Sequence, residues 1–269
     1  MEQHRTLTVD GRTVHYRDEG RNNTKTLVLL HGFLQNLDVW SSYVLSYMNQ
    51  LRVITIDLPG HGLTDTFCDV HTTEFMADIV KEVLNAAGVD QCVVVGHSMG
   101  GYVALAFAER YPYTVRGLGL VNSHAMADST SQREGREEVC RQAQENVASY
   151  IVGFVASLFD ESRRAAMSQE INDLQSQCLR TGAASVVAAQ QGMMRRPSRI
   201  GVLQQLDVPV YFVYGKNDPR IPIELAVTQT LLPRRAEVLL LSDVAHMAFL
   251  EEREYLKPRL LSFVEGCYA

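Results

Sequence analysis

The sequence predicts an α/β fold, with a mostly parallel central sheet and helices on both of its faces. Three observations support this prediction. Apolar strand-like runs alternate with runs of helical periodicity along most of the 269 residues, an order typical of parallel sheets with crossover helices. The strand-like runs are apolar almost throughout, as expected of strands that are covered on both faces. The alternation is interrupted once, between residues 123 and 200, where only helical patterns occur.

The first predicted element is a β-hairpin, because "LTVDGRTVHYRDE" alternates polar and apolar residues around the turn signal Asp10-Gly11. Six strands are then predicted, at Thr26–His31, Leu51–Asp57, Gln91–Gly96, Val115–Val121, Val208–Tyr214 and Glu237–Leu241. Helices are predicted between or after these strands, at Thr73–Ala87, Met99–Arg110, Ile223–Leu232 and Glu251–Val264.

The interruption between two strands is predicted to be an all-helical insertion. Apolar residues recur there at helical spacing, in the series Val139, Ala143, Val147, Ile151, Val155 and the series Met167, Ile171, Leu174, Cys178. We interpret residues 123–200 as a lid over the carboxyl edge of the sheet, and residues 1–122 and 201–269 as the core. The alternative is a second packed helical layer without a gating role.

Composition and charge exclude several classes of protein. The net charge of −6 argues against nucleic acid as a partner. The basic pairs Arg163-Arg164, Arg195-Arg196 and Arg234-Arg235 are interpreted as solvated faces and not as anion sites. The five cysteines lack CxxC spacing, and neither HExxH nor GxGxxG occurs, so neither a metal nor a cofactor is predicted.

The chain is expected to be cytoplasmic and without membrane contact. The N-terminal stretch "MEQHRTLTVDGRTVHYRDEG" contains no apolar core of a secretory signal. No apolar run approaches the ~18 residues that a membrane helix needs. The sequence makes no prediction of the oligomeric state.

One strand-to-helix junction carries the strongest chemical signal. The stretch "VVVGHSMGGYVALAFAERYP" places Ser98 where a β-branched run turns directly into a helix. Such an abrupt turn forces its central residue into a strained conformation, and glycine at positions 96 and 100 removes side chains that would collide across it. The serine hydroxyl then stands above the sheet, beside the free N–H groups that begin the helix. We therefore predict Ser98 as a nucleophile.

A serine hydroxyl needs a base to take its proton, and that base needs a carboxylate to orient it. His246 lies just past the last predicted strand and Asp218 just past the penultimate one, and ligands bind at such strand ends. The order Ser98, Asp218, His246 is the order associated with this turn. Asp128 is the alternative acid, whereas Asp243 is too close in sequence to His246 to support its ring.

Attack on a carbonyl creates an oxyanion that requires hydrogen-bond donors. The N–H of Met99 is one donor, by the construction of the turn. The other is expected from the loop after the first long strand, where Gly32 permits an unusual backbone turn and the N–H of Phe33 can point inward. His31, His61 and His97 are interpreted as residues that fix their loops and take no part in the chemistry.

Five segments carry a family resemblance: "LVLLHGF", "DLPGHG", "VVVGHSMGGYVALAFAERYP", "VPVYFVYGKNDPRIP" and "AHMAFLEE". In this order they resemble the α/β-hydrolase superfamily, in its lid-bearing, esterase-like branch, over most of the chain outside the lid. The resemblance implies an α/β-hydrolase fold, the triad of Ser98, Asp218 and His246, and the oxyanion amides of Phe33 and Met99. Ala245 is a departure, because the family often has glycine before the histidine.

The predicted reaction is hydrolysis of a small-molecule carboxylic ester or thioester through an acyl-enzyme, because serine and not aspartate stands at the turn. Candidate residues for lining the substrate pocket are Leu34, His124, Phe154 and Phe159. The resemblance leaves alternatives open. Lyases of the menaquinone pathway, carbon–carbon hydrolases and cofactor-free perhydrolases use the same triad, and some receptors of this fold keep it but turn over slowly.

Overall fold

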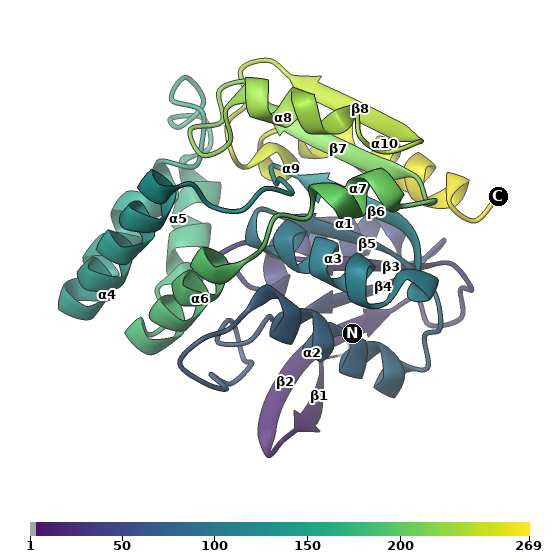
Figure 1. Cartoon of the computed structure of the whole chain (residues 1–269), viewed down its shortest axis with the longest axis horizontal. Coiled ribbons are helices and arrows are strands. Elements are labelled where there is room, and N and C mark those ends of the chain that lie inside the picture. Colours follow the sequence, from purple (N-terminus) through teal and green to yellow (C-terminus); the bar gives the residue numbers. More distant parts are fainter. Residues whose placement is uncertain (1–3) are drawn as a thin grey trace.

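A single mixed sheet runs through the protein, in a computed structural model that describes residues 4–269 (Figure 1). Its strands are β1 (His4–Val9), β2 (Arg12–Glu19), β3 (Thr26–Leu30), β4 (Arg52–Ile56), β5 (Cys92–His97), β6 (Val115–Val121), β7 (Val210–Gly215) and β8 (Ala236–Leu241). The strand order is β1-β2-β4-β3-β5-β6-β7-β8. Pairing is antiparallel for β1 with β2 and for β2 with β4, and parallel from β4 to β8. The predicted mostly parallel sheet is confirmed.

Helices cover both faces of this sheet (Figure 1). They are α1 (Ser41–Tyr47), α2 (Thr73–Ala87), α3 (Met99–Arg110), α4 (Thr130–Ala156), α5 (Ser168–Cys178), α6 (Ala183–Arg195), α7 (Ile200–Gln205), α8 (Ile223–Thr230), α9 (Ala248–Glu251) and α10 (Arg253–Gly266). Helices α2, α3 and α7 pack together on one face, and α1 and α10 on the other. Every residue of β3 and β5 is buried, which is why their sequences are continuously apolar.

Three local predictions differ from the structure. The short elements at 37–47 were not predicted, because they are shaped by packing of Trp40, Tyr43 and Tyr47, whose side chains are almost fully buried. Strand β8 forms an edge of the sheet and is largely exposed. The predicted last helix, Glu251–Val264, corresponds to α10, which begins only at Arg253 because Glu252, with φ of −125° and ψ of 40°, is not helical and separates it from the short α9.

Four helices lie between β6 and β7, and three of them, α4, α5 and α6, lie in the segment 123–200 that the sequence predicts to be all-helical. Helices α4, α5 and α6 pack on one another and project beside the sheet (Figure 1). Helix α4 begins with a capping box of Ser129 and Gln132 and is kinked at Asn146. The side-chain oxygen of Asn146 accepts a hydrogen bond from the N–H of Ser149, so the second half of the helix has a cap of its own.

Candidate active site

The site is centred on the turn between β5 and α3, where Ser98 adopts a strained conformation with φ of 50° and ψ of −114°. The turn is tight because the chain folds back on itself. A methyl group at Gly96 would lie 2.1 Å from the carbonyl oxygen of Gly100, and one at Gly100 would lie 2.4 Å from that of Leu30. Only glycine fits at these two positions. The glycines therefore allow the close approach that exposes the serine hydroxyl.

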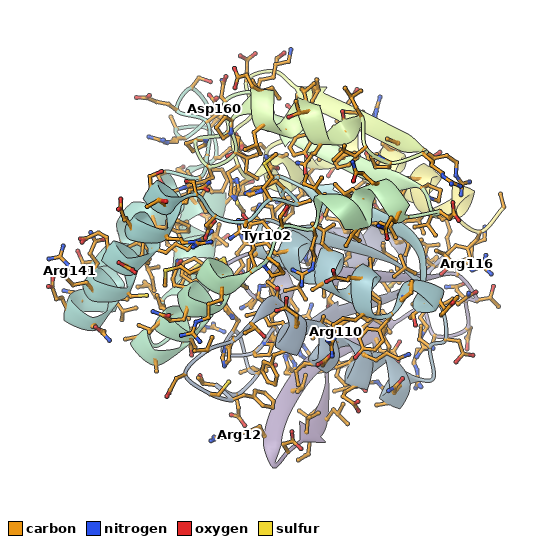
Figure 2. All side chains as sticks on the ribbon, in the orientation of Figure 1. Arg12, Tyr102, Arg110, Arg116, Arg141 and Asp160 are labelled. Carbon is orange, nitrogen blue, oxygen red and sulfur yellow. The ribbon has the colours of Figure 1, made fainter. Side chains whose placement is uncertain are left out.

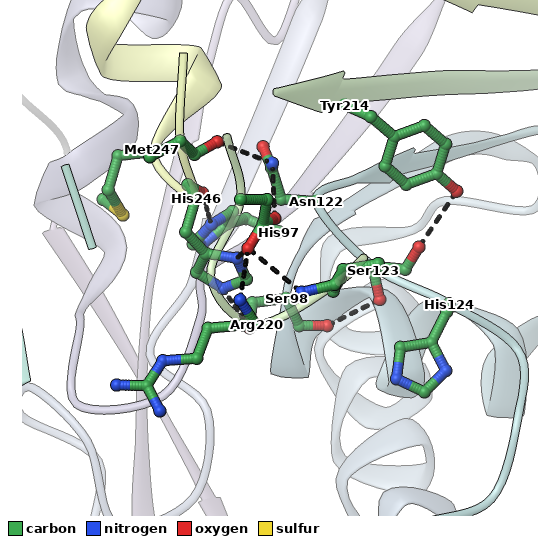
Figure 3. A network of polar contacts seen from close by, with 12 residues as sticks. His97, Ser98, Asn122, Ser123, His124, Tyr214, Arg220, His246 and Met247 are labelled. Atoms are coloured by element: carbon green, nitrogen blue, oxygen red, sulfur yellow. Dashed lines mark hydrogen bonds and ion pairs between the residues drawn. The ribbon is translucent and has the colours of Figure 1, made fainter. Parts of the chain in front are cut away.

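Ser98 and two residues from distant strand ends form a continuous hydrogen-bonded series. The Oγ of Ser98 lies 2.9 Å from the Nε2 of His246 (Figure 3). The Nδ1 of His246 lies 2.8 Å from one carboxylate oxygen of Asp218 and 3.0 Å from the other. The three predicted side chains are thus brought together although they stand far apart in the sequence. The carboxylate fixes the imidazole tautomer, with Nδ1 protonated and Nε2 free to accept a proton.

The Asp218 carboxylate is held as an anion by its surroundings. Its Oδ1 accepts hydrogen bonds from the backbone N–H groups of Arg220 and Ile221 at 2.8 and 3.1 Å. Its Oδ2 accepts one from the Nδ2 of Asn122 at 2.8 Å. Burial would raise the pKa of Asp218, but the attraction of His246 and these hydrogen bonds outweigh burial and lower it. The carboxylate can therefore stabilise a positive charge on His246.

In the loop that carries His246, the backbone N–H groups of three successive residues donate hydrogen bonds to acceptors elsewhere in the chain. Oε1 of Glu251 accepts the N–H groups of Ala245 and Met247 at 3.0 and 3.2 Å. The N–H of His246 itself donates to the carbonyl oxygen of Leu158 at 2.9 Å. Burial raises the pKa of Glu251. The hydrogen bonds that the Glu251 carboxylate accepts fix Ala245 and Met247, the residues on either side of His246.

Two histidines of the neighbouring loops have structural contacts. The Nε2 of His97 donates to the carbonyl oxygen of His246 at 2.9 Å. The Nε2 of His31 accepts the N–H of Leu58, and its Nδ1 donates to the carbonyl oxygen of Gly32. Burial lowers the pKa of both rings. These contacts agree with the interpretation that these residues fix their loops.

The amides of Phe33 and Met99 lie in the two turns that the sequence singles out. Met99 is the first residue of α3, and Phe33 follows β3. Neither N–H has a hydrogen-bond acceptor within residues 4–269. Leu34, the next residue, has a positive φ of 66°, so the backbone of this loop reverses beside Phe33. Two free donors on neighbouring strand ends are the arrangement that an oxyanion requires.

A cavity of about 310 Å³ opens above Ser98 and His246, a volume suited to a small molecule. Phe33, His124 and Phe154 line it. Leu34 and Phe159 do not: both are buried, and Phe159 lines a separate depression. The cavity above Ser98 is also lined by the polar side chains of Tyr102, Gln132, Arg136, Gln190 and Arg220.

The structure corrects one interpretation of a basic pair. Arg196 does not lie on a solvated face but is 3% exposed. Its guanidinium stacks over the Tyr102 ring at 4.0 Å and pairs with Asp128 at 2.7 Å. Asp128 is also paired with Arg136 and has no contact with His246. The geometry therefore joins His246 to Asp218, and not to the alternative acid.

The sequence reasoning missed two positioning residues, Asn122 and Glu251. Asn122 has a φ of 45° at the end of β6 and donates both to Asp218 and to the carbonyl oxygen of Ala245 (Figure 3). Asn122 could have been predicted as a site residue, because it follows β6, the strand between those that precede Ser98 and Asp218. Glu251 had a weaker signal, since only the folded loop shows that its carboxylate returns to the N–H groups beside His246.

The buried histidines predict a loss of stability in mild acid. Burial lowers the pKa of His61, His97 and His124 from 6.5 to about 3. Below about pH 6.5 the unfolded chain binds protons at these rings and the folded protein does not, so stability is fully present above this pH and falls until about pH 3. Each ring is expected to remove about 1.4 kcal/mol per pH unit.

Urea unfolding at about pH 7.5, 6 and 5 measures this effect. The variant His61→Gln keeps an N–H near the carbonyl oxygen of Pro59, to which the ring now donates, and should lower the slope by the share of one ring, about 1.4 kcal/mol per pH unit. A free energy of unfolding that is constant across this window would contradict the prediction.

The sheet order and the strand–turn–helix around Ser98 define the class of this protein, an enzyme of the α/β hydrolase fold. The chain belongs to this family, whose model, described as alpha/beta hydrolase fold, matches residues 25–253. The chain is 26% identical to a 2-hydroxy-6-oxononadienedioate/2-hydroxy-6-oxononatrienedioate hydrolase of Paraburkholderia phymatum, over 93% of this chain and 90% of that protein.

Two further similarities extend over nearly the whole chain. A thermophilic esterase from Thermogutta terrifontis, solved with malate bound, superposes with a TM-score of 0.91 at 26% identity and covers 100% of both chains. The acetyltransferase component of the acetoin cleaving system of Cupriavidus necator is 28% identical over 91% of this chain. The chain spans 64% of the length of that component.

Sites of two other kinds are absent from the part of the chain that the structure describes. Within residues 4–269, no helix combines the length and the apolar character needed to cross a membrane. Over the same residues, no group of three or more His, Cys, Asp or Glu side chains is arranged to hold a metal ion.

Proposed function

We propose that this enzyme hydrolyses a small carboxylic ester or thioester through an acyl-enzyme on Ser98. His246 acts as the base and acid, and Asp218 orients its ring. The observation that carries the proposal is the series of contacts of 2.9 Å from Ser98 to His246 and 2.8 Å from His246 to Asp218, at the floor of a cavity. These distances are those of a nucleophile and base ready for proton transfer.

In the first half-reaction, the Oγ of Ser98 attacks the carbonyl carbon while the Nε2 of His246 takes the hydroxyl proton. The carbonyl oxygen becomes an oxyanion, which accepts hydrogen bonds from the N–H groups of Phe33 and Met99. Removing one such donor typically costs about 3–4 kcal/mol of transition-state stabilisation. Collapse of this intermediate breaks the bond to the alcohol or thiol, which leaves with the proton from His246.

In the second half-reaction, water takes the place of the leaving group. His246 removes a proton from the water as its oxygen attacks the acyl carbon, and a second oxyanion forms on the same amides. The bond to Ser98 then breaks, Ser98 recovers its proton from His246, and the carboxylic acid is released. Asp218 remains ionised throughout and stabilises the imidazolium that forms twice.

The helical segment of residues 123–200 has the role of a lid in this proposal, above a core of residues 1–122 and 201–269. Phe154 from α4 and Gln190 and Met193 from α6 line the cavity, so the packing of these helices determines its shape and hence the substrate. We place the enzyme in the cytoplasm, with a small molecule and not a nucleic acid as its partner.

A second candidate is cleavage of a carbon–carbon bond, by hydrolysis or by elimination. The similarity to the 2-hydroxy-6-oxononadienedioate hydrolase over 93% of this chain favours it. The same serine, imidazole and oxyanion donors would then stabilise an enolate or a tetrahedral intermediate of a ketone. Product analysis separates the two candidates. Ester hydrolysis releases an alcohol and an acid, whereas cleavage of a carbon–carbon bond releases no alcohol as the leaving group.

The proposal is tested with a panel of acyl esters and thioesters of varied chain length, beside labelling with a serine-directed phosphonate. We expect multiple turnovers of at least one ester, and one phosphonate bound per chain, at Ser98. Labelling at another residue would overturn the assigned nucleophile. Stoichiometric ligand binding without turnover would instead identify a receptor-like member of the fold.

A further inference from the structure

The cavity above Ser98 presents cations and hydrogen-bond donors but no carboxylate. Arg136 from α4 and Arg220 from the loop after β7 both line it, and no aspartate or glutamate is among its lining residues. The carboxylate of Asp218, the partner of His246, is already engaged. Asp218 is bound by His246, Asn122 and two backbone N–H groups.

The cluster of Arg136, Arg196 and Asp128 beside the cavity holds more positive than negative charge. Arg136 and Arg196 share one carboxylate, that of Asp128, at 2.7 Å each. The side chain of Asp128 is fully buried and that of Arg196 is 2% exposed, whereas that of Arg136 is 20% exposed. Burial would raise the pKa of Asp128, but the two guanidinium groups outweigh it and lower it. Two cations and one anion therefore leave one positive charge in this cluster.

Arg220 adds a second positive charge at the other side of the cavity. Its guanidinium stacks over the Phe154 ring at 4.8 Å and donates to the Oγ of Ser157. It has no carboxylate partner within residues 4–269. In Figure 3 this guanidinium extends away from Asn122 and His246.

Two glutamines at the cavity wall each add an NH₂ donor. The Oε1 of Gln132 accepts the N–H of Ser129, and the Oε1 of Gln190 accepts the Nη1 of Arg136. These contacts fix the amide orientations, so each NH₂ group remains for a ligand. Arg136 uses Nε for Asp128 and Nη1 for Gln190, which leaves Nη2.

From this arrangement we propose that the preferred substrate carries a free carboxylate, bound in the cavity by Arg136 and Arg220 while Ser98 attacks the ester carbonyl. This inference rests on the proposed ester hydrolysis and names its substrate class. A carboxylate has four acceptor positions and complements a wall of cations and amide donors, and charge-assisted hydrogen bonds of this kind are about twice as strong as neutral ones.

The first test compares charged and neutral esters of matched shape. Monomethyl adipate is paired with methyl hexanoate, to place the carboxylate on the acyl side. 4-Acetoxybutanoate is paired with butyl acetate, to place it on the alcohol side. We expect kcat/KM for at least one charged ester to exceed that of its neutral partner by about 10- to 100-fold, and the ratio to fall as salt is added. Equal or inverted ratios in both pairs would overturn the inference.

The second test removes one cation at a time. Arg220→Gln and Arg136→Gln should lower the charged-to-neutral ratio of kcat/KM by about 10-fold or more. Arg220→Gln is the decisive variant, since that guanidinium has no carboxylate partner to leave unpaired. The matched control is Arg141→Gln on α4, whose side chain is 66% exposed and pairs with Glu138. Figure 2 shows Arg141 on the outer side of the helical segment, away from the sheet.

Binding of adipate to the Ser98→Ala protein separates this inference from the proposed reaction. Titration calorimetry should show one adipate bound per chain, with an affinity that falls at least 10-fold when Arg220→Gln is added. If no ester is cleaved and Ser98 is not labelled, the proposed reaction is wrong, and adipate binding still decides the substrate class. Absence of adipate binding, or binding that is insensitive to Arg220→Gln, would overturn the inference.

Discussion

The substitution Ser98→Ala is expected to lower kcat for an activated short-chain ester by about 10⁴- to 10⁶-fold. The hydroxyl lies 2.9 Å from the Nε2 of His246, and no other nucleophile is assigned in the proposed reaction. The variant retains the oxyanion donors of Phe33 and Met99, so slow hydrolysis by water is expected to persist. Steady-state kinetics and loss of phosphonate labelling measure the effect.

A folded control is needed, since a misfolded variant would also be inactive. Alanine, like serine, is strained at a φ of 50°, so Ser98→Ala should unfold at nearly the wild-type urea concentration. Ser98→Gly relieves the strain and should be more stable than Ser98→Ala by about 1 kcal/mol, yet equally inactive. Wild-type turnover in either folded variant would refute the role of Ser98.

The sequence was informative about the fold wherever both faces of a strand are covered. The buried strands β3 and β5 are continuous apolar runs that cannot form an amphipathic surface element, so their prediction needed no knowledge of tertiary contacts. Strand β8 shows the opposite case, because Val238 and Leu240 are 39% and 41% exposed at the sheet edge. The short helix α1 depends on aromatic packing between distant segments, which no local pattern reports.

Those residues of the candidate site that directly follow strands could be predicted from the sequence. Ser98, Asp218 and His246 follow β5, β7 and β8, and a parallel sheet brings these ends to one edge. The cavity wall was not predictable in the same way, because α4 and α6 set it through tertiary packing. For this reason Leu34 and Phe159 were named as lining residues, whereas Arg136 and Gln190 were not. Arg196 belongs to a basic pair in sequence, and only the fold shows it buried.

The substitution Asp218→Asn is expected to lower kcat by about 10⁴-fold, through the imidazole tautomer. Two backbone N–H groups bind Oδ1 of Asp218, so the amide oxygen of an asparagine would occupy that position. Its NH₂ group would then face the Nδ1 of His246, which must accept a hydrogen bond and lose its proton. The proton of the neutral ring moves to Nε2, which can no longer take the proton of Ser98.

Asp243→Asn is the matched control, because it makes the same chemical change in the loop before His246. Asp243 is exposed and has a φ of 55°, which asparagine adopts readily, so its activity should stay close to that of the wild type. The proposed tautomer change is read directly from the ¹⁵N chemical shifts of the His246 ring, which distinguish Nδ1–H from Nε2–H. A large loss of kcat with an unchanged tautomer would show that Asp218 acts by its charge alone, and unchanged kcat would remove it from the site.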